Sequence, residues 1–194
     1  MAGSITIVIT ISSAIAASPW FAWTDHALSD LGRDGRASAP IFNIGIIVSG
    51  ILAFVFALGV LDASRVRLGR VGGIVLCIAT TGLIGIGVFP LPDPLHNISG
   101  LILWTLLPAA LSIIGRALMQ TGKRRLGLGT AAAAVVTGIF GGITIAIAAQ
   151  GNPAIAIPEA IVMAAAIVWI FIVSIKLVRC TMWHWEHSHG AAES

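Results

Sequence analysis

The sequence predicts an all-α membrane protein, with six transmembrane helices in one bundle and both termini in the cytosol. Of its 194 residues 57% are hydrophobic and only 10% are charged, and the mean hydropathy is +0.99. A soluble domain carries about 25% charged residues, so lipid surrounds most of this chain. Six apolar stretches each have roughly the 20 residues that cross a hydrocarbon layer. Basic residues gather in the loops on one side of these stretches, and an excess of Lys and Arg is typical of cytosolic loops.

The first predicted span covers residues 3–23. It ends in an aromatic group typical of a membrane interface, made of Trp20, Phe21 and Trp23. No Lys or Arg precedes the apolar run, whereas a secretory signal peptide begins with a basic segment. We therefore expect this segment to be retained as a helix.

Five further spans are predicted over residues 40–61, 71–89, 94–119, 128–149 and 158–178. Ser38 is a natural N-cap for the first of these helices, and Asp93 can cap the helix that begins at Pro94. Glu159 lies in the first turn of the last span, where a carboxylate interacts favourably with the helix dipole. Residues 1–182 thus form one transmembrane domain, and residues 183–194 are expected to be a short cytosolic tail.

The distribution of basic residues predicts the orientation. Nine of the 11 Lys and Arg residues fall on one side of the spans: Arg65, Arg67, Arg70, Arg116, Lys123, Arg124, Arg125, Lys176 and Arg179. Arg33 and Arg36 are alone on the other side. Basic loops stay in the cytosol, so we expect a multi-pass protein of the cell membrane. These charges are topology signals in short turns, which predicts membrane lipids as partners and no nucleic acid.

Small residues are frequent inside the spans. Gly69 and Gly73, and likewise Gly138 and Gly142, are four residues apart, a spacing that lets two helices approach closely in lipid. Packing within the bundle is the main expectation. A homo-oligomer formed through these glycine-rich faces is the alternative.

Polar residues gather in the three outer connections. The first holds Asp25, His26, Ser29, Asp30 and Asp34, the second holds Asp93, His96 and Asn97, and the third holds Asn152 and Glu159. Asn43 lies about one turn inside the second span. Because a bundle would bring these helix ends to one mouth, we predict a ligand-binding pocket formed by Ser29, Asp30, Asn43, His96, Asn97 and Glu159.

Several chemistries fit this cluster. His26, Asp30, His96 and Glu159 could supply a divalent metal site, because histidine and carboxylate are usable zinc ligands. Asp30, His96 and Glu159, or Ser29 with His96 and an acid, could instead form an interfacial hydrolase acting on a lipid. A small transporter is a further alternative, but no Asp, Glu, Lys or His lies at mid-membrane, where a transport path usually needs one. The leading hypothesis is a non-enzymatic pocket for a lipid headgroup or small polar ligand.

A resemblance to a known family follows from several short motifs. These are Leu28-Ser29-Asp30-Leu31-Gly32, Ile41-Phe42-Asn43, Gly87-Val88-Phe89-Pro90 followed by His96 and Asn97, and Pro158-Glu159. In this order they resemble the archaeal and bacterial membrane family called "domain of unknown function 998". The resemblance implies about six helices and nominates Ser29, Asp30, Asn43, His96 and Glu159, but implies no activity. Ala160 stands where the family pattern suggests a basic residue. A weaker similarity points to the Frag1/DRAM/Sfk1 membrane proteins, which are linked to lipid handling.

Overall fold

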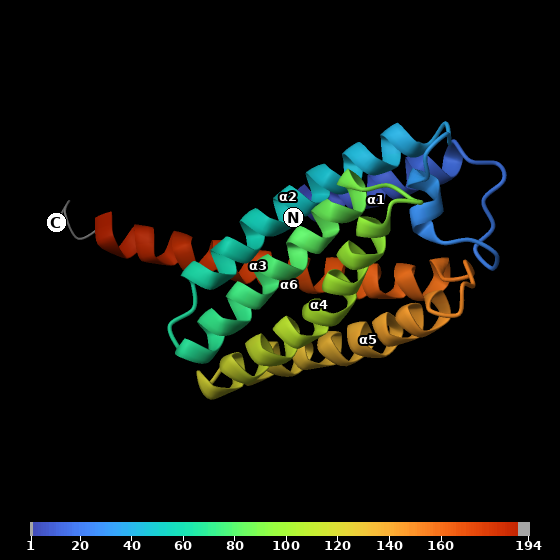
Figure 1. Cartoon of the computed structure of the whole chain (residues 1–194). Coiled ribbons are helices and arrows are strands. Elements are labelled where there is room, and N and C mark those ends of the chain that lie inside the picture. Colours follow the sequence, from blue (N-terminus) through green and yellow to red (C-terminus); the bar gives the residue numbers. More distant parts are fainter. Residues whose placement is uncertain (1, 190–194) are drawn as a thin grey trace.

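The computed structural model describes the backbone of residues 2–189 and the side chains of residues 2–176. All regular secondary structure in its described part is helical, joined by turns and short connections (Figure 1). The elements are α1 (Ala2–Ala16), the short 3-10 helix η1 (Leu28–Gly32), α2 (Ala39–Asp62), α3 (Arg67–Val88), α4 (Pro94–Gln120), α5 (Arg124–Ala148) and α6 (Ala156–His189). This confirms the predicted class, a polytopic helical membrane protein.

Five of these helices are long and apolar enough to cross a membrane. They are α2 to α5 and the Ala156–Lys176 part of α6. Helix α1 is apolar but shorter, because it ends at Ala16 and not near Trp23 as predicted. The chain beyond it forms turns that carry Trp20, Phe21 and Trp23. The first segment is therefore a short helix followed by an aromatic turn region, and its start lies beside Leu52 in the middle of α2.

Helices that follow one another in sequence pack side by side, from α1 to α6, and α1 also touches α6. The closest approaches of a glycine to the backbone of a neighbouring helix involve glycines of α3. A Cβ at Gly82 would lie 2.6 Å from the Ser99 carbonyl oxygen of α4, and one at Gly73 would lie 2.8 Å from Leu61 Cα of α2. Gly73 therefore serves packing within the chain, whereas Gly142 of α5 has open space beside it.

The helix starts bear out one capping prediction and change another. The Asp93 side chain accepts a hydrogen bond from the Leu95 N–H (2.8 Å) and caps α4 as expected. Ser38 stands at the N-cap position of α2, but its side chain caps no N–H of that helix. Its hydroxyl instead donates to the Leu31 carbonyl oxygen (2.8 Å). Ser38 thus ties η1 to α2, because a buried carbonyl of η1 lies within reach and needs a donor.

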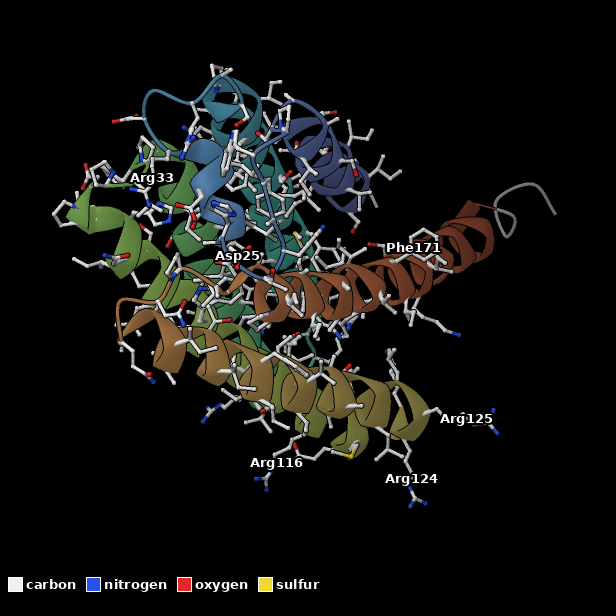
Figure 2. All side chains as sticks on the ribbon, turned by 90° about the vertical axis from the view of Figure 1, so that its right-hand side faces the viewer. Asp25, Arg33, Arg116, Arg124, Arg125 and Phe171 are labelled. Atoms are coloured by element: carbon white, nitrogen blue, oxygen red, sulfur yellow. The ribbon has the colours of Figure 1, made fainter. Side chains whose placement is uncertain are left out.

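The bundle has two chemically different ends. The polar end carries η1 and the connections α1–α2, α3–α4 and α5–α6, while the basic end carries the connections α2–α3 and α4–α5 (Figure 1). Figure 2 looks onto the polar end, where Asp25 and Arg33 lie among the connections. Helices α5 and α6 are close together at the polar end and diverge toward the basic end (Figures 1 and 2). The sequence-based orientation makes the polar end the outer one, which remains a prediction.

Candidate functional site

Two carboxylates hold the start of η1 at the polar end. Asp30 Oδ2 accepts a hydrogen bond from the Ala27 N–H (2.9 Å), and Glu159 Oε2 of α6 accepts one from the Leu28 N–H (2.7 Å). Both acids are buried. The first N–H groups of a helix lack partners within the helix, so this short helix needs acceptors from outside its backbone. Glu159 therefore fixes η1 against α6 across 131 positions of sequence.

Arg33 completes this arrangement, although the charge pattern of the sequence marks it only as an exception. Its Nε and Nη2 atoms donate to Asp30 Oδ1 (3.1 and 2.7 Å). The Arg33 side chain is 39% exposed and that of Asp30 is 7% exposed, so the pair reaches from the interior to the surface. The i, i+3 spacing of Asp30 and Arg33 is the feature of the sequence that could have predicted this ion pair. The other outward arginine, Arg36, lies 4.0 Å over the Trp20 ring.

His96 is buried in the first turn of α4 and faces the end of α3. Its Nδ1 atom lies 2.8 Å from the Phe89 carbonyl oxygen. A carbonyl only accepts, so Nδ1 must carry the hydrogen and donate it. Phe89 follows the last residue of α3, where carbonyl groups lose their helical partners. His96 thus closes the α3–α4 connection at the polar end.

Two predicted site residues, Asn43 and His26, make contacts within the α1–α2 connection and its junction with α2. The Asn43 side-chain nitrogen donates to the Gly32 carbonyl oxygen (2.9 Å), which fastens the end of η1 to α2. His26 Nδ1 accepts from the Ala22 N–H (3.1 Å), and its ring lies against Trp20 and Phe21. Neither residue lines the cavity at the polar end. Both positions therefore serve the connection between α1 and α2.

The cavity at the polar end has a volume of about 630 Å³ and is polar at its mouth, within the range of typical small-molecule sites. Its polar lining comes from all three connections: Ser29, Asp30, Arg33, His96, Asn97, Asn152 and Glu159. Five of the six predicted ligand residues line this cavity together with Arg33, and only Asn43 lies outside it. The fold thus brings residues that are distant in sequence together at the mouth of one cavity.

The deeper lining of the same cavity is apolar. It runs between the helices along Ile7 and Ile11 of α1, Phe42 and Ile46 of α2, Leu103 and Leu107 of α4, and Val162 and Met163 of α6. Hydrocarbon walls beneath a charged mouth can accommodate the two parts of an amphiphile. A purely polar solute would leave this deeper surface without a matching partner.

The three polar connections are also joined by backbone hydrogen bonds. The Ala156 N–H donates to the His26 carbonyl oxygen (3.0 Å), and the Asp34 N–H donates to the Leu91 carbonyl oxygen (3.0 Å). The first bond joins the α1–α2 connection to the start of α6, and the second joins it to the α3–α4 connection. The mouth of the cavity is consequently a fixed structure built from segments distant in sequence.

The predicted metal site and the predicted hydrolase site each require particular side chains to meet. Across the side chains described, up to residue 176, no group of three or more His, Cys, Asp and Glu residues is placed to hold a metal ion. His26 packs against Trp20 and Phe21 and does not line the cavity that the other three predicted ligands line. No hydrogen bond joins Ser29 to His96 within the same range. The metal, the hydrolase and the transporter remain predictions from sequence.

Comparison with known proteins gives one family. A model described as "Protein of unknown function (DUF998)" matches residues 1–176. Neither the curated proteins nor the solved structures contain a match, and the similarity to the Frag1/DRAM/Sfk1 proteins is not confirmed. The match covers α1 to α5 and the part of α6 that lines the cavity. The chain therefore belongs to the DUF998 family of membrane proteins.

Proposed function

We propose that this membrane protein binds an amphiphile in the cavity at its polar end, with the headgroup at the mouth and the hydrocarbon part between the helices. The observation that carries the proposal is the division of a single cavity into a charged mouth and apolar walls. Ligand pockets combine apolar surface with a few convergent polar groups in this way.

The mouth favours a headgroup that donates hydrogen bonds or carries positive charge. Asp30 Oδ1 is taken by Arg33, whereas Glu159 uses Oε2 for the Leu28 N–H. Oε1 of Glu159 has no hydrogen-bond partner among the described residues, and the residue lines the cavity. The Ser29 hydroxyl also lines it and can either donate or accept. An amine or hydroxyl of the headgroup would find its acceptors there.

The role of Asp30 and Arg33 is to shape the mouth. Their ion pair occupies the surface side of η1 and holds the helix that presents Ser29. His96 and Asn97 present the opposite wall from α4. On this proposal the protein holds its ligand without transforming it, and the site lies in the outer leaflet if the predicted orientation holds.

The test compares lipids retained by the purified full chain in detergent, measured by native mass spectrometry and lipid extraction. Ala166→Phe, which fills the apolar depth of the cavity, is expected to remove the bound amphiphile. Ile157→Phe is the control, because Ile157 is an exposed position of the same helix that does not line the cavity. Glu159→Gln retains an acceptor for Leu28 and is expected to change which headgroups are retained. Equal retention by wild type and all three variants would refute the proposal.

A further inference from the structure

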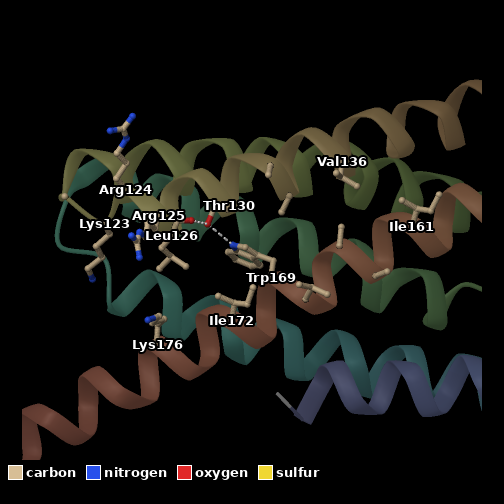
Figure 3. A pocket seen from close by; sticks show the side chains of 17 residues that line it. Lys123, Arg124, Arg125, Leu126, Thr130, Val136, Ile161, Trp169, Ile172 and Lys176 are labelled. Atoms are coloured by element: carbon tan, nitrogen blue, oxygen red, sulfur yellow. Dashed lines mark hydrogen bonds between the residues drawn. The ribbon is translucent and has the colours of Figure 1, made fainter.

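A second cavity lies on the opposite half of the molecule, along the seam between α5 and α6 (Figure 3). Its volume is about 1180 Å³, larger than the roughly 300–1,000 Å³ of most small-molecule pockets. It shares no lining residue with the cavity at the polar end. The groove exists because α5 and α6 diverge and present small residues to each other, such as Gly129 and Ala133 opposite Ala165.

The floor of this groove is fixed and has its polar groups satisfied. The buried Trp169 of α6 donates from Nε1 to the Thr130 hydroxyl of α5 (3.0 Å). That hydroxyl in turn donates to the Leu126 carbonyl oxygen (2.9 Å). The Trp169 ring also packs edge-on against Phe56 of α2, with ring centroids 5.6 Å apart. The remaining walls are aliphatic, so an occupant of this part of the groove must be apolar.

The end of the groove at the basic end has the opposite character. Lys123, Arg125 and Lys176 converge there from α6 and from the start of α5, while Arg124 points away from α6 (Figure 3). The only ion pair among the described side chains is that of Arg33 with Asp30. Nor does any hydrogen bond join these three cations to a described residue. Their positive charge therefore lacks compensation from the part of the chain that is described.

We infer that the α5–α6 groove binds an anionic phospholipid, with its acyl chains along the seam and its phosphate between Lys123, Arg125 and Lys176. Charge complementarity selects this occupant over a neutral lipid. Basic pockets between transmembrane helices on the cytoplasmic side bind anionic headgroups in this way. The positive-inside orientation would place this end at the cytosolic leaflet. No residue of the polar-end cavity takes part, so the inference stands apart from the proposed function.

The first experiment removes charge. The full chain is purified in mild detergent with mixed micelles of phosphatidylglycerol and phosphatidylcholine that have identical acyl chains, and the retained lipids are counted by native mass spectrometry. Wild type is expected to retain phosphatidylglycerol preferentially. The triple variant Lys123→Gln, Arg125→Gln, Lys176→Gln is expected to reduce that preference about a hundredfold, since each of the three basic residues contributes on the order of 1 kcal/mol near an anionic surface.

The matched control removes three exposed charges elsewhere at the basic end, with Arg65→Gln, Arg67→Gln and Arg70→Gln. It is expected to keep the wild-type preference. An equal loss in both triple variants would overturn the inference, because general surface attraction would then explain the binding. Absence of any preference in wild type would overturn it as well.

A second experiment fills the groove without changing charge. Ala164→Trp adds a large side chain at an exposed groove position, and Val55→Trp adds the same side chain on the lipid-facing side of α2. Only the first is expected to release phosphatidylglycerol, with both variants eluting as folded protein. If Ala164→Trp instead turned a dimer into a monomer and left lipid retention unchanged, a second copy of the chain would be the occupant and the inference would be wrong.

Discussion

The two acidic side chains that hold η1 at the polar end of the bundle are buried and hydrogen-bonded, whereas the basic side chains beside the α5–α6 groove at the basic end are exposed. Asp30 and Glu159 accept hydrogen bonds from successive N–H groups at the start of η1. Lys123, Arg125 and Lys176 make no ion pair or hydrogen bond with any described residue. At the polar end the acidic side chains stabilise the fold, whereas at the basic end the side chains of the lysines and arginine can bind a ligand. Substitutions should therefore affect stability at the first end and lipid preference at the second.

The largest effect on stability is expected for Asp30→Ala. It removes the acceptor of the Ala27 N–H and leaves Arg33 without its partner. A buried donor left unsatisfied costs about 1–3 kcal/mol, and the partial exposure of Arg33 limits any further loss. We expect a loss of about 2–3 kcal/mol in the free energy of unfolding, measured by denaturant titration in detergent.

Asp30→Asn and Asp25→Ala are the controls for that prediction. The first keeps an acceptor for Ala27 and is expected to be intermediate. The second removes an exposed acid of the same connection and is expected to change stability by less than about 0.5 kcal/mol. If Asp30→Ala cost no more than Asp25→Ala, the polar end would not depend on buried charge and the comparison between the two ends would fail.

A smaller effect is expected for Thr130→Val in the floor of the groove. The change keeps the shape of the side chain but leaves Trp169 Nε1 without its acceptor. We expect a loss of about 1–2 kcal/mol, measured in the same titration. Thr105→Val is the control, because the exposed Thr105 hydroxyl bonds only to carbonyls of its own helix. A loss no larger than that of the control would show that the bond between α5 and α6 contributes little.

The smallest effect on stability is expected for Lys123→Gln, Arg125→Gln and Lys176→Gln together, measured without anionic lipid. Exposed side chains away from structural features usually change stability by less than about 0.5 kcal/mol each. With phosphatidylglycerol present, the wild type should gain thermal stability that the triple variant lacks. A large loss of stability without lipid would show that these charges belong to the fold, contrary to the comparison.

The family motif residues illustrate how far prediction of the site could go. Ser29, Asp30, His96 and Glu159 follow or precede apolar spans on the same side, which predicts a shared site, and they line one cavity. The same argument applies to Asn43 and His26, but these two residues make local contacts instead. Sequence position gives the end of the helix on which a residue lies, but not the direction of its side chain. That direction depends on helix rotation and on loop geometry.

The groove between α5 and α6 could not be predicted from sequence. Its basic residues were read as topology signals, and its small residues as ordinary helix-packing positions. Both readings are compatible with a closed seam. The divergence of the two helices opens the seam, and it follows from where α6 packs against its other neighbours, through contacts such as that of Trp169 with Phe56 of α2.

The sequence by itself determined the helical class, the long apolar spans and the separation of basic from acidic ends. These features depend on local hydropathy and on short-range charge, because each span must satisfy its own backbone in lipid. Only the tertiary structure decided that α1 ends at Ala16, that Arg33 pairs with Asp30, that Glu159 holds η1, and that the α5–α6 seam is open. These features depend on contacts between segments whose relative positions are set by packing of the whole bundle.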